Sequence, residues 1–345
     1  MNKDLLEHIK QLSSSNLKEV IAIRRHIHQH PELSFEEHKT SAFIQSKLTE
    51  FGIPFKTGFV KTGIVALIEG KNPSKKVIAL RADMDALPII EENDVSYKSQ
   101  NEGVMHACGH DVHSSSLLGV VKILNELKSE FEGTIKLIFQ PGEEKLPGGA
   151  SLMINEGVLE NPATQAIVGQ HVFPDLPYGK VGFRGGMYMA SCDEIYVTVK
   201  GKGGHAALPH KFVDTVLISC QIINSLQQIV SRKARPDIPC VLSFGKINST
   251  GGATNIIPDE VKIEGTFRTM NEEWRNEAHT LMVQMAEDIA KSMGGTCEFD
   301  IHRGYPFLKN DVKTTEISKS SAQEYLGKEN VIDLDLRMTG EDFSY

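Results

Sequence analysis

The sequence is organised around one short stretch, His106-Ala107-Cys108-Gly109-His110-Asp111-Val112-His113. Three imidazoles, a thiol and a carboxylate crowd into it, and each of these groups loses hydration on burial unless it gains a partner or a metal ion. Gly109 permits a tight turn, so that Cys108 and His110 can converge on one ion. Apolar residues at helical spacing follow between Asp111 and Phe131. The stretch therefore predicts a metal site on a loop that leads into a helix.

Two histidines of this stretch have a second explanation. His106 or His113, taken alone, is explained equally well as a surface residue or a helix cap. That explanation does not extend to Cys108 and His110 as a pair, because their side chains can reach the same ion.

The composition of the chain limits its class. A length of 345 residues favours two domains, and a hydrophobic fraction of 40% is typical of a globular protein. The net charge of -8 leaves no basic surplus for nucleic acid. Neither a signal peptide nor a membrane-spanning run is expected, and five scattered cysteines fit a reducing compartment. The predicted location is therefore the cytoplasm, without a membrane partner.

An N-terminal helix is predicted from Asn16 to His30, beginning after Ser13-Ser14-Ser15. It carries histidines at alternate positions, His26, His28 and His30. Alternate positions do not share one face of a helix, so this region predicts a solvated face and no metal site.

Acidic residues follow the predicted strand from Val77 to Ala82. Asp83 and Asp85 lie two positions apart, so in an extended chain they point the same way. In open α/β sheets, sites form at the carboxyl ends of strands. An Asx turn before Pro88 is the alternative explanation.

Two more predicted strands end in residues that can bind metal. The strand from Thr134 to Gln140 leads to Glu143 and Glu144, and a later strand ends at His171. Adjacent carboxylates repel each other unless cations neutralise them, which suggests that one binds metal while the other handles protons. A charged surface turn is the alternative. Because strands and helices alternate here, right-handed parallel units are expected to gather these ends at one sheet edge.

The pattern changes after about residue 181. Alternating residues predict a half-buried strand at 194–200, and further strands and long helices follow up to 293. This order predicts a small α+β domain of ferredoxin-like type, with helices on an antiparallel sheet. The predicted fold class is therefore α/β, with a central mostly parallel sheet and helices on both faces. The first domain would comprise residues 1–181 and 295–345, and the inserted domain residues 182–294.

Together these motifs resemble the M20 family of metallopeptidases, in particular the amidohydrolase branch with hippurate, N-acetyl amino acid and auxin-conjugate hydrolases. The resemblance extends over essentially the whole chain. Its motifs lie at Arg25–Ser34, Arg81–Pro88, His106–His113, Gln140–Glu144, Gly169–Val172, Gly203–Ala207, Thr254–Asp259 and Gly340–Phe343.

The resemblance assigns roles to the motif residues. Two divalent ions per subunit, Zn²⁺, Mn²⁺ or Co²⁺, are implied. Glu143 matches the general base of the family, and Asp85 matches an acid that supports the metal site from outside the ligand shell. The residues that match the metal ligands are Cys108, His110, Glu144 and His171.

The resemblance also implies a homodimer, formed through the inserted domain. His205 matches a residue that reaches across the dimer to stabilise the developing oxyanion. Asn255 and Arg268 match positions near the substrate carboxylate, which suits the bidentate fork of an arginine. A glycine-rich turn would explain His205 equally well, and a surface charge on a strand edge would explain Arg268.

The expected activity is hydrolysis of the amide bond in a small N-acyl amino acid. A dipeptidase or carboxypeptidase is an alternative, as is a thiol hydrolase with Cys108 as nucleophile and His110 as base. The thiol hydrolase would leave Glu144 and His171 without a role. A third alternative is an inactive dimeric binding protein, because family members continue past Gly340–Phe343 and supply one more histidine ligand. The resemblance therefore implies either a truncated C-terminus or one metal ion left open to solvent.

Overall fold

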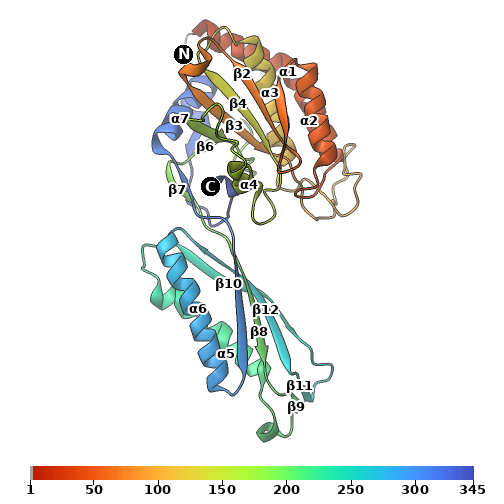
Figure 1. Cartoon of the computed structure of the whole chain (residues 1–345), viewed down its shortest axis with the longest axis vertical. Helices are drawn as coiled ribbons and strands as arrows, with labels where there is room; N and C mark the ends of the chain where they lie inside the picture. The colour runs from red at the N-terminus through yellow and green to blue at the C-terminus, as the bar shows by residue number, and fades with distance from the viewer. Residues whose placement is uncertain (1–2) are drawn as a thin grey trace. The chain divides into compact units, whose positions relative to one another are not determined.

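The computed structural model describes residues 3–345, and the chain divides into two compact units (Figure 1). The first unit comprises the described residues up to 183, residues 312–334 and residue 345. The second unit comprises residues 184–311 and 335–344. None of the described helices is long and apolar enough to cross a membrane.

A five-stranded sheet forms the centre of the first unit. Its order is β1-β2-β4-β3-β5, and β3 pairs in parallel with both β4 and β5. Because β2 is antiparallel to both β1 and β4, four strands run in one direction and β2 opposes them. The expected α/β class with a mostly parallel sheet is confirmed. The strands are β1 (Phe55–Phe59), β2 (Gly63–Glu69), β3 (Val77–Asp83), β4 (Thr134–Gln140) and β5 (Ala166–Gly169).

Helices cover both faces of this sheet. Side chains alternate between the faces, so Ile64 and Leu137 pack against α1, α2 and α3 while Val65 and Ile138 pack against α4. The helices are α1 (Lys3–Gln29), α2 (His38–Glu50), α3 (His110–Glu126) and α4 (Gly149–Asn155). Also in this unit are α7 (Val312–Leu326) and the parallel pair β6 (Val181–Phe183) and β15 (Val331–Asp333).

Helix α1 begins well before the predicted start at Asn16. The Ser13-Ser14-Ser15 run lies inside the helix, where the Ser15 hydroxyl donates a hydrogen bond back to the Leu12 carbonyl at 2.9 Å. A serine can satisfy its hydroxyl in this way within a helix, so the run did not mark an N-cap.

Lys136 is a fully buried cation in the middle of β4. Its ammonium group donates hydrogen bonds to the carbonyls of Val158, Glu160 and Pro162, at 2.7 to 2.8 Å. These carbonyls belong to the irregular chain after α4, so one side chain fixes that segment against the sheet. Burial lowers the pKa of Lys136, and the three acceptors offset the cost of burying the charge.

Replacing Lys136 with methionine should destabilise the first unit. The side chain keeps its approximate length, but three buried carbonyls lose their donor, and we expect the free energy of unfolding to fall by about 3 kcal/mol. Urea denaturation measures the change. Lys56→Met, at an exposed position of β1, is the matched control and should change it by less than about 0.5 kcal/mol. A Lys136→Met protein as stable as the parent would contradict this role.

A four-stranded antiparallel sheet forms the second unit, in the order β10-β12-β8-β13. Helices α5 and α6 pack on it around one core that includes Val197, Ile218 and Met282. Along the chain the main elements follow the order strand, helix, strand, strand, helix, strand, as in ferredoxin-like folds. The elements are β8 (Asp193–Lys200), α5 (Thr215–Gln228), β10 (Cys240–Ser249), β12 (Glu260–Thr269), α6 (Glu272–Ser292) and β13 (Thr296–Arg303).

The sequence boundary at residue 295 falls before β13, which pairs with β8 from Thr296 to Arg303. Strand β13 therefore belongs to the second unit by its hydrogen bonds, although the predicted boundary assigned it to the first domain. Gly294 and Gly295, where the domain boundary was predicted, lie in the turn between α6 and the last strand of this sheet. The unit also has the pairs β7 (Gly186–Met189) with β14 (Leu308–Asn310) and β9 (Gly204–His205) with β11 (Ile256–Ile257).

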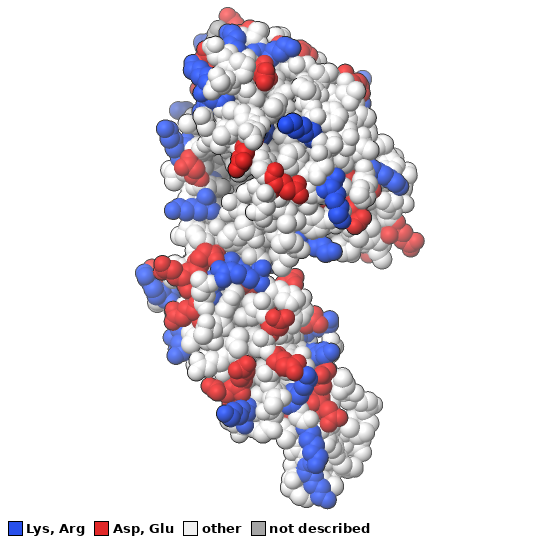
Figure 2. Space-filling model, in the orientation of Figure 1, with Lys and Arg blue, Asp and Glu red and all other residues white. Residues whose placement is uncertain are grey.

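Charges of both signs are interspersed over the described residues on the face drawn in Figure 2. Lys and Arg do not gather there into a continuous basic surface. The distribution agrees with the acidic net charge and gives no support to a nucleic-acid partner.

Candidate metal and catalytic site

Gly109 shapes the loop that carries the central motif. It has φ +91° directly before α3, a conformation that residues with a side chain rarely adopt. A Cβ at this position would lie 2.3 Å from Cγ2 of Val172. Only glycine therefore lets the start of α3 approach the chain after β5 closely enough to bring His110 beside His171.

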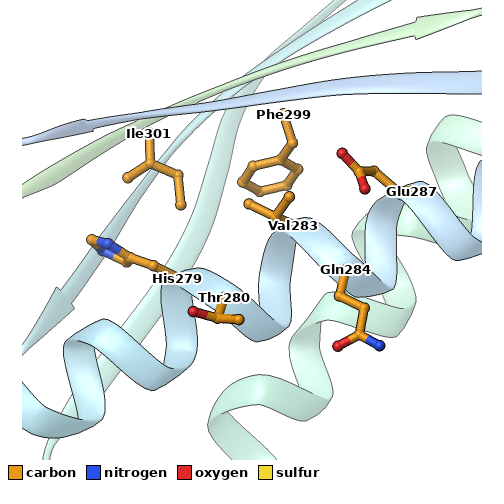
Figure 3. Close-up of a pocket in the computed structure, with 7 residues that line it drawn as sticks. All are labelled: His279, Thr280, Val283, Gln284, Glu287, Phe299 and Ile301. Atoms are coloured by element: carbon orange, nitrogen blue, oxygen red, sulfur yellow. The ribbon is translucent and has the colours of Figure 1, made fainter.

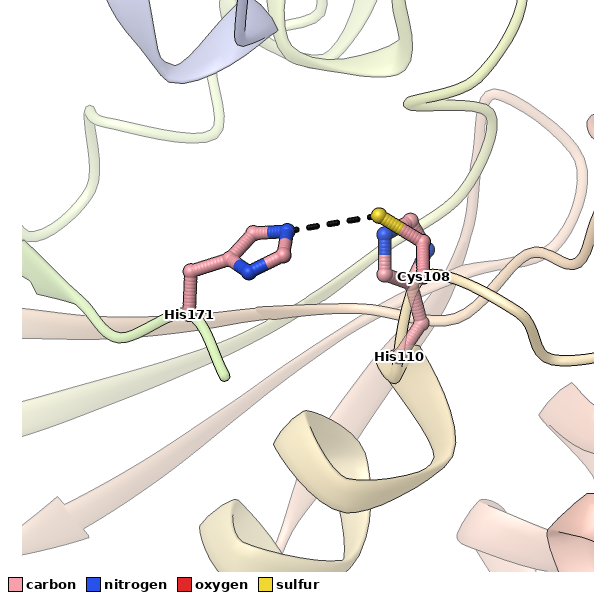
Figure 4. A group of neighbouring side chains, drawn as sticks. All are labelled: Cys108, His110 and His171. Carbon is pink, nitrogen blue, oxygen red and sulfur yellow. Dashed lines mark hydrogen bonds between the residues drawn. The ribbon is translucent and has the colours of Figure 1, made fainter. Parts of the chain in front are cut away.

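Cys108 and His171 face each other across this approach (Figure 4). The Cys108 sulfur lies 3.4 Å from Nε2 of His171, and the ring of His171 points toward it. Nδ1 of His171 donates to the Val172 carbonyl at 2.7 Å, so the lone pair of the ring is on Nε2, which faces the sulfur. The ring is thus oriented as a ligand would be.

His110 and Glu144 present two buried ligand atoms to each other. Nε2 of His110 and Oε1 of Glu144 are 3.7 Å apart, and neither has a hydrogen-bond partner. Burying such atoms without a partner costs free energy, so we expect a bound group to contact both of them.

Asp85 holds both of these residues. It accepts a hydrogen bond from Nδ1 of His110 at 3.1 Å, from the backbone N–H of Glu144 at 2.9 Å and from the Ser34 hydroxyl at 2.6 Å. Burial would raise the pKa of Asp85, but the hydrogen bond and charge of His110 outweigh it and leave the pKa below its ordinary value. An ionised Asp85 on Nδ1 directs Nε2 of His110 toward Glu144, which is the arrangement of a metal-binding histidine.

The residues present fit a divalent metal ion. Ligand atoms of Cys108, His110 and His171 all lie within 4.8 Å of one another, and so do those of His110, Glu143 and Glu144. Sulfur, imidazole nitrogen and carboxylate oxygen together suit transition metals such as zinc. Burial raises the pKa of the Cys108 thiol to about 11, so the thiol requires a nearby cation to ionise near neutral pH.

A buried carboxylate that the sequence analysis missed supports the Glu143-Glu144 loop. Glu37 is fully buried and accepts hydrogen bonds from the backbone N–H groups of Gly142 and Phe35 and from the Thr62 hydroxyl, each at 2.8 Å. Gly142 has φ +65°, and a Cβ there would lie 2.3 Å from the Phe35 ring. Nothing next to Glu37 in the sequence, where it follows Glu36, marks it as a partner of the Gly142 backbone.

His28 corrects the prediction of a solvated face on α1. It is only 4% exposed, and its ring contacts Asp111 at 2.8 Å and Glu91 at 3.1 Å. The prediction was wrong because α1 packs directly on α3, so its inward side carries polar as well as apolar residues. The surface explanation for His106 and His113 is also wrong, since they are 4% and 1% exposed.

The three predicted substrate residues lie at two places in the second unit. His205 is in β9, beside Asn255, whose carbonyl accepts a hydrogen bond from Ala206 N–H at 2.9 Å. Arg268 lies near the far end of β12, where its guanidinium contacts the Cys192 sulfur at 3.1 Å. Arg268 lies eight positions along β12 from Glu260, a span of about 27 Å, and the Glu260 end is the one near β9, where Asp259 accepts a hydrogen bond from Gly203 N–H. This unit therefore does not bring Arg268 and His205 together.

A hollow of about 510 Å³ lies elsewhere in the second unit, between α6 and β13 (Figure 3). It contains none of the predicted ligands, and four of its seven lining side chains are polar or charged. Its lining residues are His279, Thr280, Val283, Gln284, Glu287, Phe299 and Ile301.

Two substitutions of Glu37 distinguish the contribution of its hydrogen bonds to stability from that of its charge. Glu37→Ala removes the acceptor of two buried N–H groups and should lower the free energy of unfolding by about 2 to 4 kcal/mol. Glu37→Gln should be tolerated, because its amide oxygen can accept from both N–H groups and its NH₂ can donate to Thr62. Urea denaturation measures both, with the exposed Glu36→Gln as control.

The same variants make a prediction for pH. Burial raises the pKa of Glu37 above 4.5, so its contribution to stability is complete below pH 4.5 and declines as the pH rises through the folded-state pKa. Glu37→Gln should lack that decline. Parallel stability curves for the parent and the glutamine variant above pH 4.5 would contradict a raised pKa.

Other proteins are similar to this chain in sequence and in fold. The sequence model described as peptidase family M20/M25/M40 matches residues 79–345. N-acetyl-L-cysteine deacetylase from Bacillus subtilis (strain 168) is 43% identical, in an alignment that covers 95% of this chain and 77% of that protein. N-acyl-L-amino acid amidohydrolase from Geobacillus stearothermophilus is 42% identical over 88% of this chain and 82% of that protein. The crystal structure of Bacillus subtilis YXEP protein, described as a dinuclear metal-binding peptidase from the M20 family, has a TM-score of 0.79 and 35% identity, covering 97% of this chain and 85% of that chain.

Proposed function

This chain belongs to peptidase family M20/M25/M40, and on that premise we propose that it is a metal-dependent amidohydrolase of N-acyl amino acids. The reaction cleaves the amide bond and releases a carboxylic acid and a free amino acid. The observation that carries the proposal is the meeting of two unpaired buried atoms, Nε2 of His110 and Oε1 of Glu144, beside the Cys108–His171 contact.

The proposal assigns two divalent ions to this site, held by Cys108, His110, Glu144 and His171. Bound divalent ions polarise an amide carbonyl and lower the pKa of water toward neutrality. The thiolate favours Zn²⁺, while the nitrogen and oxygen ligands also admit Mn²⁺ and Co²⁺.

Glu143 acts as the general base in this proposal. Its carboxylate takes the proton of the attacking water and passes it to the leaving nitrogen. It is 6% exposed, and it lies with Glu144 on the loop that Glu37 and Phe35 brace. Asp85 does not handle the proton; it keeps His110 and the Glu144 backbone in position.

The substrate residues support a homodimer as part of the proposal. Arg268 is assigned to the substrate carboxylate through its two-pronged guanidinium, and His205 to the developing oxyanion. Because one second unit keeps His205 and Asn255 far from Arg268, we assign His205 of a second copy to the site. None of the five cysteines forms a disulfide bond in the described chain, which supports a reducing compartment and hence the cytoplasm.

The alternative functions are weaker for stated reasons. A thiol nucleophile at Cys108 would need a lowered pKa, whereas burial raises it. A dipeptidase or carboxypeptidase would use the same ligands and differs only in substrate. An inactive binding relative has no need for a proton-handling carboxylate beside the ligands.

Glu143→Gln should lower kcat by about 10²- to 10⁴-fold, because glutamine cannot accept the proton of water. The metal content should stay that of the parent, since the four ligands remain. Hydrolysis of N-acetyl and N-benzoyl amino acids measures turnover, and elemental analysis measures metal. Glu126→Gln, on the exposed side of α3, is the control. Full turnover by Glu143→Gln would remove Glu143 from the mechanism.

Chelation and alkylation distinguish the metal enzyme from a thiol hydrolase. Removing metal with a chelator should abolish turnover, and adding Zn²⁺, Mn²⁺ or Co²⁺ should restore it. Iodoacetamide should leave the metal-loaded protein active, because Cys108 would be engaged as a ligand, but it should prevent reloading of the metal-free protein. A Cys220→Ser background removes the exposed cysteine from this assay. Inactivation of the loaded protein at Cys108 would instead favour the thiol hydrolase.

A further inference from the structure

His113 lies in the first turn of α3, buried between the end of β3 and the chain that follows β5. We propose that it is a positioning residue that orients His171 through the backbone of Val172. The inference rests on the metal-ligand role proposed for His171. His113 itself touches neither substrate nor metal in this assignment.

Both nitrogens of the His113 ring are engaged. Nδ1 contacts Oδ1 of Asp83 at 2.6 Å, and Nε2 accepts a hydrogen bond from the Val172 N–H at 2.8 Å. Since the backbone N–H can only donate, Nε2 carries no proton, and the proton resides on Nδ1. These contacts define one neutral tautomer of His113.

Val172 transmits this constraint to His171. Its N–H is fixed by His113, and its carbonyl accepts the Nδ1–H of His171 at 2.7 Å. The second contact leaves Nε2 of His171 facing the Cys108 sulfur at 3.4 Å. Val172 also packs on Gly109, which has no room for a side chain there. The rings of His113 and His171 lie 4.6 Å apart, so a shift of one would displace the other.

The cluster of Asp83, His110 and His113 is a support and not a further metal site. Its ligand atoms lie within 4.8 Å of one another, which alone would suggest a third ion. Asp83 already receives Arg81 at 2.6 Å on Oδ2 and His113 on Oδ1, and His113 has no free nitrogen. The Asp83 side chain therefore anchors His113, and His113 anchors the chain after β5.

Two amide substitutions separate the two contacts of His113. In Asn the side-chain amide lies near the place of Nδ1, so His113→Asn can donate to Asp83 but cannot reach Val172. In Gln it lies near the place of Nε2, so His113→Gln can accept from Val172 but loses Asp83. Each variant gives up one buried hydrogen bond, so the stability of the metal-free proteins should fall by similar amounts.

Titration with Co²⁺ tests the inference, because a cobalt–thiolate absorption band reports Co²⁺ bound at Cys108. We expect His113→Asn to bind Co²⁺ about 10- to 100-fold more weakly than the parent, and His113→Gln to stay within about threefold of it. Urea denaturation of the metal-free proteins shows whether folding alone explains a difference. Equal affinity of His113→Asn and the parent would overturn the inference, and so would equal weakening of both variants.

The unsubstituted protein supplies two further tests. If it gives no cobalt–thiolate band, the proposed metal site fails, and the role of His113 fails with it. If the band is present, the two His113 variants and the tautomer of His113 decide whether the inference holds. Imidazole ¹⁵N shifts of the metal-free protein should show His113 and His171 both protonated on Nδ1. A proton on Nε2 of His113 would overturn the inference without any substitution.

Discussion

The carboxylate of Asp85 is the point on which the site depends. It joins His110 at the start of α3, the backbone of Glu144 after β4 and the hydroxyl of Ser34 after α1. A buried carboxylate stays ionised only if hydrogen bonds replace its lost hydration, and these three contacts do so. The same contacts bring segments far apart in sequence to one place. Asp85 can therefore be buried as an ion only when these three segments are in place, and two of them carry the proposed ligands His110 and Glu144.

Three other buried ionisable side chains in the first unit are also surrounded by hydrogen-bonding partners. Asp83 is bound by Arg81 and His113, Glu37 by two backbone N–H groups and a hydroxyl, and Lys136 by three carbonyls. Each group is charged or readily charged, and each fixes a loop against the central sheet. Such networks tolerate little displacement, because a misplaced partner leaves a buried group unpaired. Polar contacts therefore help to fix the loops that carry Glu143, Glu144 and His171.

Prediction from the sequence succeeded where the pattern was local. The strand Thr134–Gln140 has the predicted limits, because the residue pattern of a strand is visible within one segment. It failed where partners lie far apart. His28 was expected on a solvated face, and β13 was placed outside the smaller sheet. Glu37 was missed, because nothing near it in sequence shows that Gly142 would need its oxygen.

The sequence by itself determined the chemical groups and where the strands that carry them end. Strand and helix alternation predicted that the strand ends before Glu143, Glu144 and His171 lie at one sheet edge, and the crowded motif singled out Cys108 and His110. The roles proposed for these residues came from the family resemblance. The tertiary structure alone decided which ring nitrogen carries the proton in His110, His113 and His171. A tautomer depends on the partner of the other ring nitrogen, and those partners, Asp85, Asp83 and Val172, are brought near only by folding.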